Sequence, residues 1–490
     1  MLFSSMIFLW IFLPIVLLGN ELLSRIQMNE DARINAKNMF LLGASFVFYA
    51  WGGIYYLLIM IASIVINYFG GLMIGRKLKK SAERKKCLLL IIAANLTILF
   101  VFKYFNMLVI ILENIIDPHG GGSIFGMQGT GSLGLPTIVL PIGISFFTFQ
   151  AMSYVIDVYR GDAAVQDNIF YFALYVSFFP QLIAGPIVRY HEVEEQINFR
   201  EEKLVLRAMG IKRFCYGIGK KVLLANTFAR VADDIWALGD GNIKGMVAWL
   251  GMICYTLQIY YDFSGYSDMA IGLGRMFGFR FAENFRYPYL ADSIQEFWRR
   301  WHISLSTWFK EYVYIPLGGN RKGKNRTLLN LFIVFLLTGI WHGANFTFIG
   351  WGIFYAVLLI MERLFLGQLL KKNRFKVINH IYTMFAVMIA WVLFRSDTIY
   401  QAGSIIRGLF DFSGNNFQIL SFLSNKLILF LIAGIAFCGP VQSRYGRWYR
   451  RHKKDARVMR WDLVFQVVLL VLSILSLVGG TYNPFIYFQF

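Results

Sequence analysis

Long apolar segments recur along the whole chain and restrict its fold more than any other feature. The first covers residues 8–18, and further ones cover about 39–52, 54–74, 88–116, 137–158, 168–188, 244–262, 328–340, 345–367, 379–395, 424–440 and 462–480. A helix that spans a bilayer needs roughly 20 apolar residues, and several of these segments are shorter. We therefore expect an all-α, polytopic membrane bundle with about eleven spans, supplemented by re-entrant and interfacial helices.

The composition agrees with this class. Hydrophobic residues make up 57% of the 490 residues and charged residues 16%, against roughly 25% charged in ordinary soluble chains. A soluble enzyme, a disordered chain and a secreted disulfide scaffold are therefore excluded. The apolar runs are continuous, so the alternating strands of an outer-membrane barrel are excluded as well. The four cysteines lie far apart without a Cys-x-x-Cys pair, which indicates buried apolar side chains.

The net charge of +20 would suggest nucleic acid as the partner of a soluble chain. Here the basic residues concentrate in four short segments, 76–86, 321–326, 371–376 and 444–460. The positive-inside rule places such segments in the cytoplasm, so we expect a lipid bilayer and no nucleic acid as the partner. One apolar run follows the last basic segment, which predicts an extracytoplasmic C-terminal tail at 481–490.

Two polar stretches interrupt the apolar runs. Residues 190–232 are amphipathic, and residues 281–327 mix charged side chains with many aromatics. We expect both to form helices in the cytoplasmic interface or along a protein-walled cavity. No soluble domain or internal repeat is apparent, so the chain is predicted to be a single membrane domain, residues 1–490. The glycine-rich segment 120–134 predicts a loop.

His342 is the ionisable residue that is hardest to explain structurally. It lies about 16 residues after Arg326, or about 24 Å along a helix. If Arg326 marks the cytoplasmic interface, His342 lies inside the roughly 30 Å hydrocarbon core, past its midplane. An ionisable residue at that depth is a functional candidate, although a histidine at a helix-turn-helix tip is the simpler alternative.

Other polar residues allow two interpretations each, a functional one and a structural one. His302 follows Arg299 and Arg300 in an aromatic-basic stretch that could equally be a membrane anchor. Asp262 and Asp268 end an apolar run, and residues 178–187 contain two prolines and a glycine. Both pieces suit either a cavity wall or a kink that packs the bundle. No HExxH, GxSxG or phosphate-binding loop appears at a usable position, and no metal site is expected.

Six segments together resemble the membrane-bound O-acyltransferase (MBOAT) family, within it the bacterial alginate O-acetyltransferase-like branch. They are 178–189, 261–270, 284–305, 312–320, 337–345 and 483–490. The resemblance implies a helical bundle with a central funnel or tunnel, and transfer of an acyl group, usually acetyl, onto a hydroxyl of a cell-envelope polymer. It maps the family's histidines onto His342 and His302. It also implies an extracytoplasmic SGNH-type transferase as partner and the bacterial cytoplasmic membrane as location.

Acyl-transfer chemistry gives these residues roles. A histidine with a pKa near 6.5 can act as a base or take an acyl group, and a buried site excludes water from the thioester. We predict His342 as the general base or acyl acceptor and His302 as a second base or donor-positioning group. The donor is expected to be acetyl-CoA, with no bound cofactor. The predicted donor-binding or cavity residues are Arg299, Arg300, Trp341, Asn345, Asp262 and Asp268.

Tyr487 lies in the C-terminal sequence Phe-Ile-Tyr-Phe-Gln-Phe. Its hydroxyl is a nucleophile on a short tether, so we predict an acyl carrier that passes the group to the partner. An aromatic anchor at the membrane interface is the alternative.

Two alternative functions stay open at this point. The first is D-alanyl transfer from a carrier-protein thioester to teichoic acid. The second is a transporter or flippase without chemistry, whose usual inverted repeats are not apparent here. The acceptor polymer is not specified by the sequence.

Overall fold

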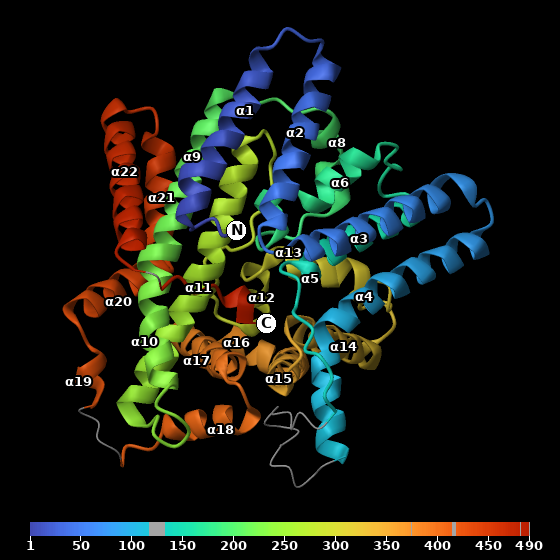
Figure 1. Ribbon diagram of the computed structural model, residues 1–490. Coiled ribbons are helices and arrows are strands. Elements are labelled where there is room, and N and C mark those ends of the chain that lie inside the picture. The colour runs from blue at the N-terminus through green and yellow to red at the C-terminus, as the bar shows by residue number, and fades with distance from the viewer. Residues whose placement is uncertain (117–132, 374, 414–417, 481, 490) are drawn as a thin grey trace.

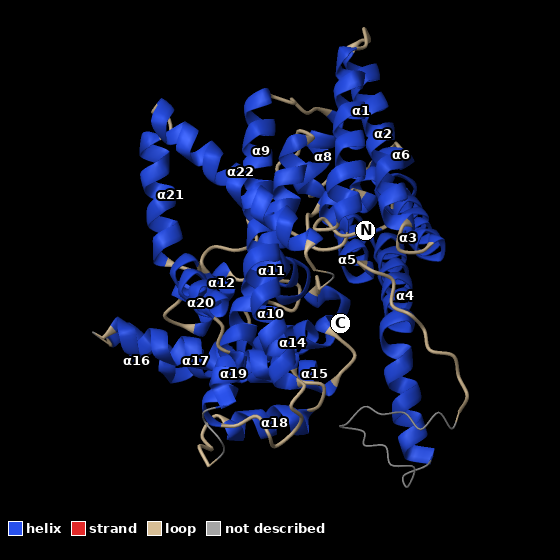
Figure 2. Ribbon diagram, turned by 60° about the vertical axis from the view of Figure 1, so that its left-hand side comes forward, coloured by secondary structure: helices blue, strands red, loops and turns tan. Residues whose placement is uncertain are grey.

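The computed structural model describes residues 1–490 except 117–132, 374, 414–417, 481 and 490. All regular elements among the described residues are helices (Figures 1 and 2), which confirms the all-α class. The predicted glycine-rich loop falls mostly outside the described residues.

The first ten α-helices are α1 (Leu13–Arg25), α2 (Glu30–Ala50), α3 (Ile54–Leu72), α4 (Ser81–Ile116), α5 (Ile144–Arg160), α6 (Ile169–Ser177), α7 (Phe179–Leu182), α8 (Tyr190–Asn198), α9 (Leu204–Gly219) and α10 (Asn226–Trp236). The others are α11 (Gly245–Met276), α12 (Ile294–Arg300), α13 (Ile303–Phe309), α14 (Lys324–His342), α15 (Phe346–Met361), α16 (Gly367–Lys372), α17 (Lys376–Arg395), α18 (Ile399–Gly408), α19 (Ile419–Phe422), α20 (Asn425–Phe437), α21 (Pro440–His452) and α22 (Ala456–Val478).

The long helix α11 is the centre of the fold, and nearly all of its 32 residues are buried. α9 packs against it, and glycines set the distance between the two backbones (Figure 1). A Cβ atom at Gly217 would lie 2.6 Å from the Gly265 carbonyl oxygen, and one at Gly272 would lie 2.7 Å from that of Gly210. Small residues at such positions allow close backbone approach. The pairing fixes an antiparallel α9–α11 contact over two helical turns.

Six helices of the described part are long and apolar enough to cross a membrane, or seven if the bent pair α20–α21 counts as one span. The apolar runs of the sequence predict about eleven spans. The numbers differ because some runs form short helices; α6 and α7, for example, have nine and four residues. On the outside, large apolar side chains such as Trp10, Leu22 and Leu90 are exposed, as a lipid-facing surface requires.

Both chain ends lie in the middle of the molecule in two views that differ by 60° (Figures 1 and 2). After α22 the chain turns back into the bundle, where Phe485 and Ile486 are buried. The side of the membrane from which this tail enters stays a prediction from the charge pattern, as does the sidedness of 190–232 and 281–327.

Candidate active site

His342 is the last residue of α14 and is buried among aromatic rings. Its ring centroid lies 4.9 Å from that of Trp351 and 5.1 Å from that of Phe394. Gly339 and Gly352 let α14 and α15 approach closely at this point, since a Cβ at Gly339 would lie 2.4 Å from the Phe348 carbonyl oxygen. The helix pair thus places His342 at a packed turn inside the bundle.

Lys103 and Tyr104 of α4 hold the end of α14. Lys103 donates to the carbonyl of Trp341, and Tyr104 donates to the carbonyl of Ile340. The last carbonyls of a helix have no partner within it, and a cation there is favoured by the helix dipole. These two contacts therefore fix the backbone immediately before His342. Lys103 was not among the residues predicted from the sequence, although a lone lysine within the apolar run 88–116 was a usable signal.

His302 lies between α12 and α13 in a left-handed backbone conformation, with φ +44°. Its side chain is buried, and its Nε2 lies 3.0 Å from the hydroxyl oxygen of Tyr487. Non-glycine residues in this conformation cost roughly 1–3 kcal/mol and cluster at functional sites. The left-handed turn places the imidazole beside the C-terminal tail.

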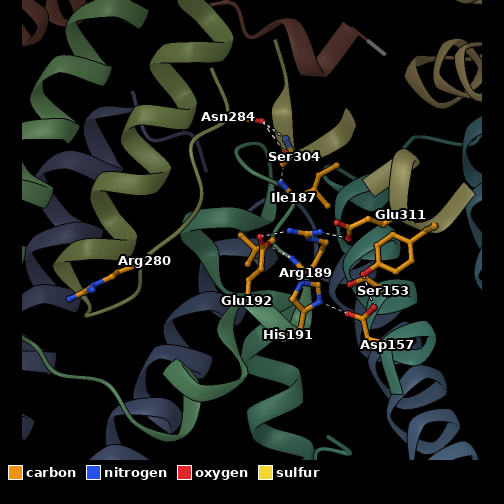
Figure 3. A network of polar contacts seen from close by, with 12 residues as sticks. Ser153, Asp157, Ile187, Arg189, His191, Glu192, Arg280, Asn284, Ser304 and Glu311 are labelled. Carbon is orange, nitrogen blue, oxygen red and sulfur yellow. Dashed lines mark hydrogen bonds and ion pairs between the residues drawn. The ribbon is translucent and has the colours of Figure 1, made fainter. Parts of the chain in front are cut away.

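The segment around His302 is tied to neighbouring loops. Asn284 accepts from the Ile303 amide at 2.9 Å and from the Ser304 hydroxyl at 2.9 Å, while Ser304 accepts from the amide of Ile187 at 2.9 Å (Figure 3). On the other side of α12, the Glu362 carboxylate accepts from the amides of Ile294 and Gln295. These bonds hold α12 and α13 in fixed positions on either side of His302.

Tyr487 is surrounded by the bundle. Its ring packs on those of Phe263 and Phe146, with centroids 4.7 Å and 5.1 Å away. Just before it, the Ile486 amide donates to Asp262 at 3.0 Å, and Lys221 donates to the carbonyl of Pro484. The predicted cavity residue Asp262 therefore holds the tail.

One cavity of about 580 Å³ contacts both His342 and Tyr487. Trp341, Asn345 and Lys103 also line it, so the structure brings two of the predicted cavity residues together with His342. Asn345 caps α15 as well, accepting from the Thr347 amide at 3.0 Å. Through this cavity an acceptor could reach the same tyrosine that His302 contacts.

A separate cavity of about 400 Å³ lies between α12–α13 and α14–α15. Its rim carries three exposed basic side chains, Arg299, Lys310 and Arg363, and none of the described residues that line it is acidic. Its wall includes Thr338, one helical turn before His342. Arg300 instead pairs with Glu296. Arg299 therefore fits the predicted donor-binding role better than Arg300 does.

Asp268 has a different environment from Asp262. It pairs with Arg213 at 2.8 Å and with Lys220 at 2.7 Å, and it lines another cavity of about 310 Å³. Both cations come from the α9 region, so Asp268 joins α9 to α11. Among the described residues, no cluster of three or more His, Cys, Asp or Glu could hold a metal ion.

A polar network links α5, α8 and the turn after α13 (Figure 3). The Asp157 carboxylate accepts from Tyr312 at 2.8 Å and lies 2.9 Å from Nδ1 of His191. The hydrogen bond to Asp157 raises the pKa of His191. Nearby, Arg189 pairs with Glu192 and Glu311. The network shares no residue with the His342 cavity, so we assign it a structural role.

Similarity to known proteins shows the family to which the chain belongs. Residues 163–396 match the membrane-bound O-acyltransferase family. The chain is similar to a probable alginate O-acetylase, AlgI, of Pseudomonas putida, with 40% identity over all of both chains. It is also similar to a peptidoglycan O-acetyltransferase of Helicobacter pylori, 31% identical over 100% of this chain and 98% of that one. A teichoic acid D-alanyltransferase of Bacillus subtilis is 29% identical over 51% of this chain and 65% of its own. The protein therefore belongs to the membrane-bound O-acyltransferase family and is a multi-pass membrane acyltransferase.

Proposed function

We propose that the protein moves an acetyl group from acetyl-CoA in the cytoplasm, through Tyr487, to a hydroxyl outside the bacterial cytoplasmic membrane. The final acceptor is a cell-envelope or exported polysaccharide, in line with the alginate and peptidoglycan named for the relatives. The observation that carries the proposal is the 3.0 Å distance between His302 Nε2 and the Tyr487 hydroxyl, because it pairs a base with a nucleophile.

In the first half-reaction, His302 acts as the base. Nε2 takes the proton of the Tyr487 hydroxyl while the oxygen attacks the thioester carbonyl. A C–O bond forms, the C–S bond breaks, and the leaving thiolate recovers the proton from His302. The product is an acetyl ester on Tyr487. The Phe263 and Phe146 rings packed on Tyr487 limit the access of water, which would otherwise hydrolyse the donor.

In the second half-reaction, His342 acts as the base in the 580 Å³ cavity that it shares with Tyr487. It takes the proton of the acceptor hydroxyl, whose oxygen attacks the acetyl-tyrosine. The bond to Tyr487 breaks, and the phenolate takes back the proton. The acceptor is the polysaccharide or, before it, a hydroxyl of an SGNH-type transferase partner.

The basic rim of the 400 Å³ cavity supports a donor with phosphate groups. Arg299, Lys310 and Arg363 lie at its opening, and the lining residues that the structure describes include no acidic one. Guanidinium and ammonium groups bind phosphate well, and coenzyme A presents several. The acetyl end would then point past Thr338 toward the histidines.

Purified protein in lipid nanodiscs with radiolabelled acetyl-CoA tests this function. We expect wild type to cleave the thioester and retain label on the protein. His302→Ala and Tyr487→Phe should retain no label, whereas His342→Ala should retain label that it does not release to a hydroxyl acceptor. Tyr482→Phe is the matched control, since Tyr482 lies on the same tail but binds Asp233; its labelling should equal that of wild type.

Two results would contradict parts of the proposal. Full polymer acetylation by Tyr487→Phe would exclude the acyl carrier but not the acetyltransferase. Labelling by a D-alanyl carrier protein and not by acetyl-CoA would favour the D-alanyl alternative, which the similarity to a teichoic acid D-alanyltransferase motivates. The transporter alternative is set aside because the chain belongs to an acyltransferase family.

A further inference from the structure

Lys221 and Asp262 form a fully buried ion pair next to the C-terminal tail. Their charged atoms lie 2.7 Å apart, and their side chains are 2% and 1% exposed. Lys221 belongs to the π-helical turn Lys220–Ala225, and Asp262 belongs to α11. A pair of this kind costs several kcal/mol of desolvation per ion and is often no more stabilising than apolar residues of similar size. Stability alone therefore does not account for it.

Each partner of the ion pair also bonds to the tail backbone. Lys221 donates to the Pro484 carbonyl, and Asp262 accepts from the Ile486 amide at 3.0 Å. Between these two points, the Phe485 ring stacks on Tyr266, with centroids 4.6 Å apart. The ion pair thus binds the tail backbone at two points immediately before Tyr487.

We propose that Lys221 and Asp262 are positioning residues that clamp the tail so that the Tyr487 hydroxyl stays at His302. This inference rests on the proposed carrier role of Tyr487. Bonds to charged groups are stronger than neutral ones, and these two use backbone atoms, so the grip does not depend on the tail's side chains. Farther up the tail, Asn483 contacts Ser4 and Asn226, which fixes the point where the tail enters.

The clamp changes how the carrier works. A swinging arm would carry acetyl from one cavity to another, but a clamped tyrosine keeps one position. Tyr487 contacts His302 and also lines the His342 cavity. Acetyl is therefore loaded and unloaded at the same oxygen.

A charge swap separates tail docking from ion-pair stability. Lys221→Asp combined with Asp262→Lys keeps an ion pair but places an acceptor against the Pro484 carbonyl and a donor against the Ile486 amide. Lys221→Met combined with Asp262→Leu removes both charges and is the second variant should the swap not fold. The matched control is Lys212→Met with Asp462→Leu, which removes the ion pair between α9 and α22 and does not touch the tail.

The readout is digestion by carboxypeptidase, followed by intact mass. In wild type and in the control, trimming should stop before Tyr487 because the clamped residues are buried. In either clamp variant it should continue through Tyr487 to Pro484, and labelling by acetyl-CoA should fall by about tenfold or more, as the loss of two bonds to charged groups implies.

The clamp proposal would be overturned if both folded variants stopped at the same residue as wild type. Because this readout needs no catalysis, it is independent of the carrier proposal. Tyr487→Phe with full polymer acetylation would refute the carrier, and a protected tail in the clamp variants would refute the clamp.

Discussion

His302 Nε2 and the Tyr487 hydroxyl oxygen lie 3.0 Å apart, although 185 residues separate them in the chain. The two groups meet because α12 and α13 present His302 in a left-handed turn and because the tail returns into the bundle after α22. The contact joins the mixed aromatic segment at 281–327 to the end of the chain.

His302→Asn should abolish loading of Tyr487 while leaving the tail in place. Asparagine tolerates the left-handed conformation better than most residues but cannot act as a base, and loss of a general base costs about 10²–10⁴-fold in rate. Single-turnover labelling with acetyl-CoA measures the rate, and carboxypeptidase trimming checks the tail. Loading within about threefold of wild type would remove His302 from the role of base.

Lys103→Met tests whether α4 positions His342. The change leaves the Trp341 carbonyl without its partner, which costs about 1–3 kcal/mol of stability, and it loosens the backbone before His342. A small misplacement of a catalytic group can cost up to about a hundredfold. We expect slow release of acetyl to an acceptor with near-normal loading of Tyr487. Equal losses in both half-reactions would point to general unfolding instead.

Local sequence patterns were sufficient for the fold class and for part of the site. Continuous apolar runs predicted an all-α membrane protein, and the depth of His342, 16 residues after Arg326, marked it as a candidate. The number of spans was harder to predict from the sequence, since the length of an apolar run alone does not separate a spanning helix from a short buried one such as α6. The structure places His342, Trp341 and Asn345 on one cavity.

Contacts between distant segments could not be predicted from the sequence. Asp262 looked like a cavity residue or a kink, and its partners lie 41 residues before it and more than 200 residues after it. No periodicity encodes such a pairing. Lys103 differs, because its isolated charge was visible and only its partner was hidden.

Gly265→Ala should destabilise the protein through the α9–α11 contact. The added methyl group would lie 2.8 Å from the Gly217 carbonyl oxygen, so the helices would have to separate, at a cost of about 1–3 kcal/mol. Gly43→Ala in α2 is the matched control, since nothing lies within 4 Å of its Cβ position. Thermal unfolding in detergent compares the two, and an equal effect on melting temperature would contradict the packing argument.

The pair His191–Asp157 predicts a pH-dependent stability. The hydrogen bond to Asp157 raises the pKa of His191, so protonated His191 favours the folded state. Its contribution is complete below the unfolded pKa of about 6.5 and is lost as pH rises through the higher folded pKa. It should not exceed about 1 kcal/mol, because the imidazole is partly in water. Melting temperatures of wild type and His191→Gln should converge as pH increases from 5.5 to 8.5; a constant difference would refute the linkage.

The basic rim of the 400 Å³ cavity should recognise the phosphates of the donor rather than its acetyl end. Replacing Arg299, Lys310 or Arg363 by Gln removes one cation from an opening whose described lining contains no acidic residue. Each loss should raise KM for acetyl-CoA by about tenfold, the worth of a charge-assisted bond, and leave kcat nearly unchanged, since the reacting atoms lie elsewhere. Acetyl-pantetheine, which lacks the phosphates, should show the same KM with wild type and variants. Arg300→Gln is the matched control, because Arg300 pairs with Glu296 on its own helix. If the three rim variants raised KM for both thioesters alike, the rim would shape the cavity rather than bind phosphate.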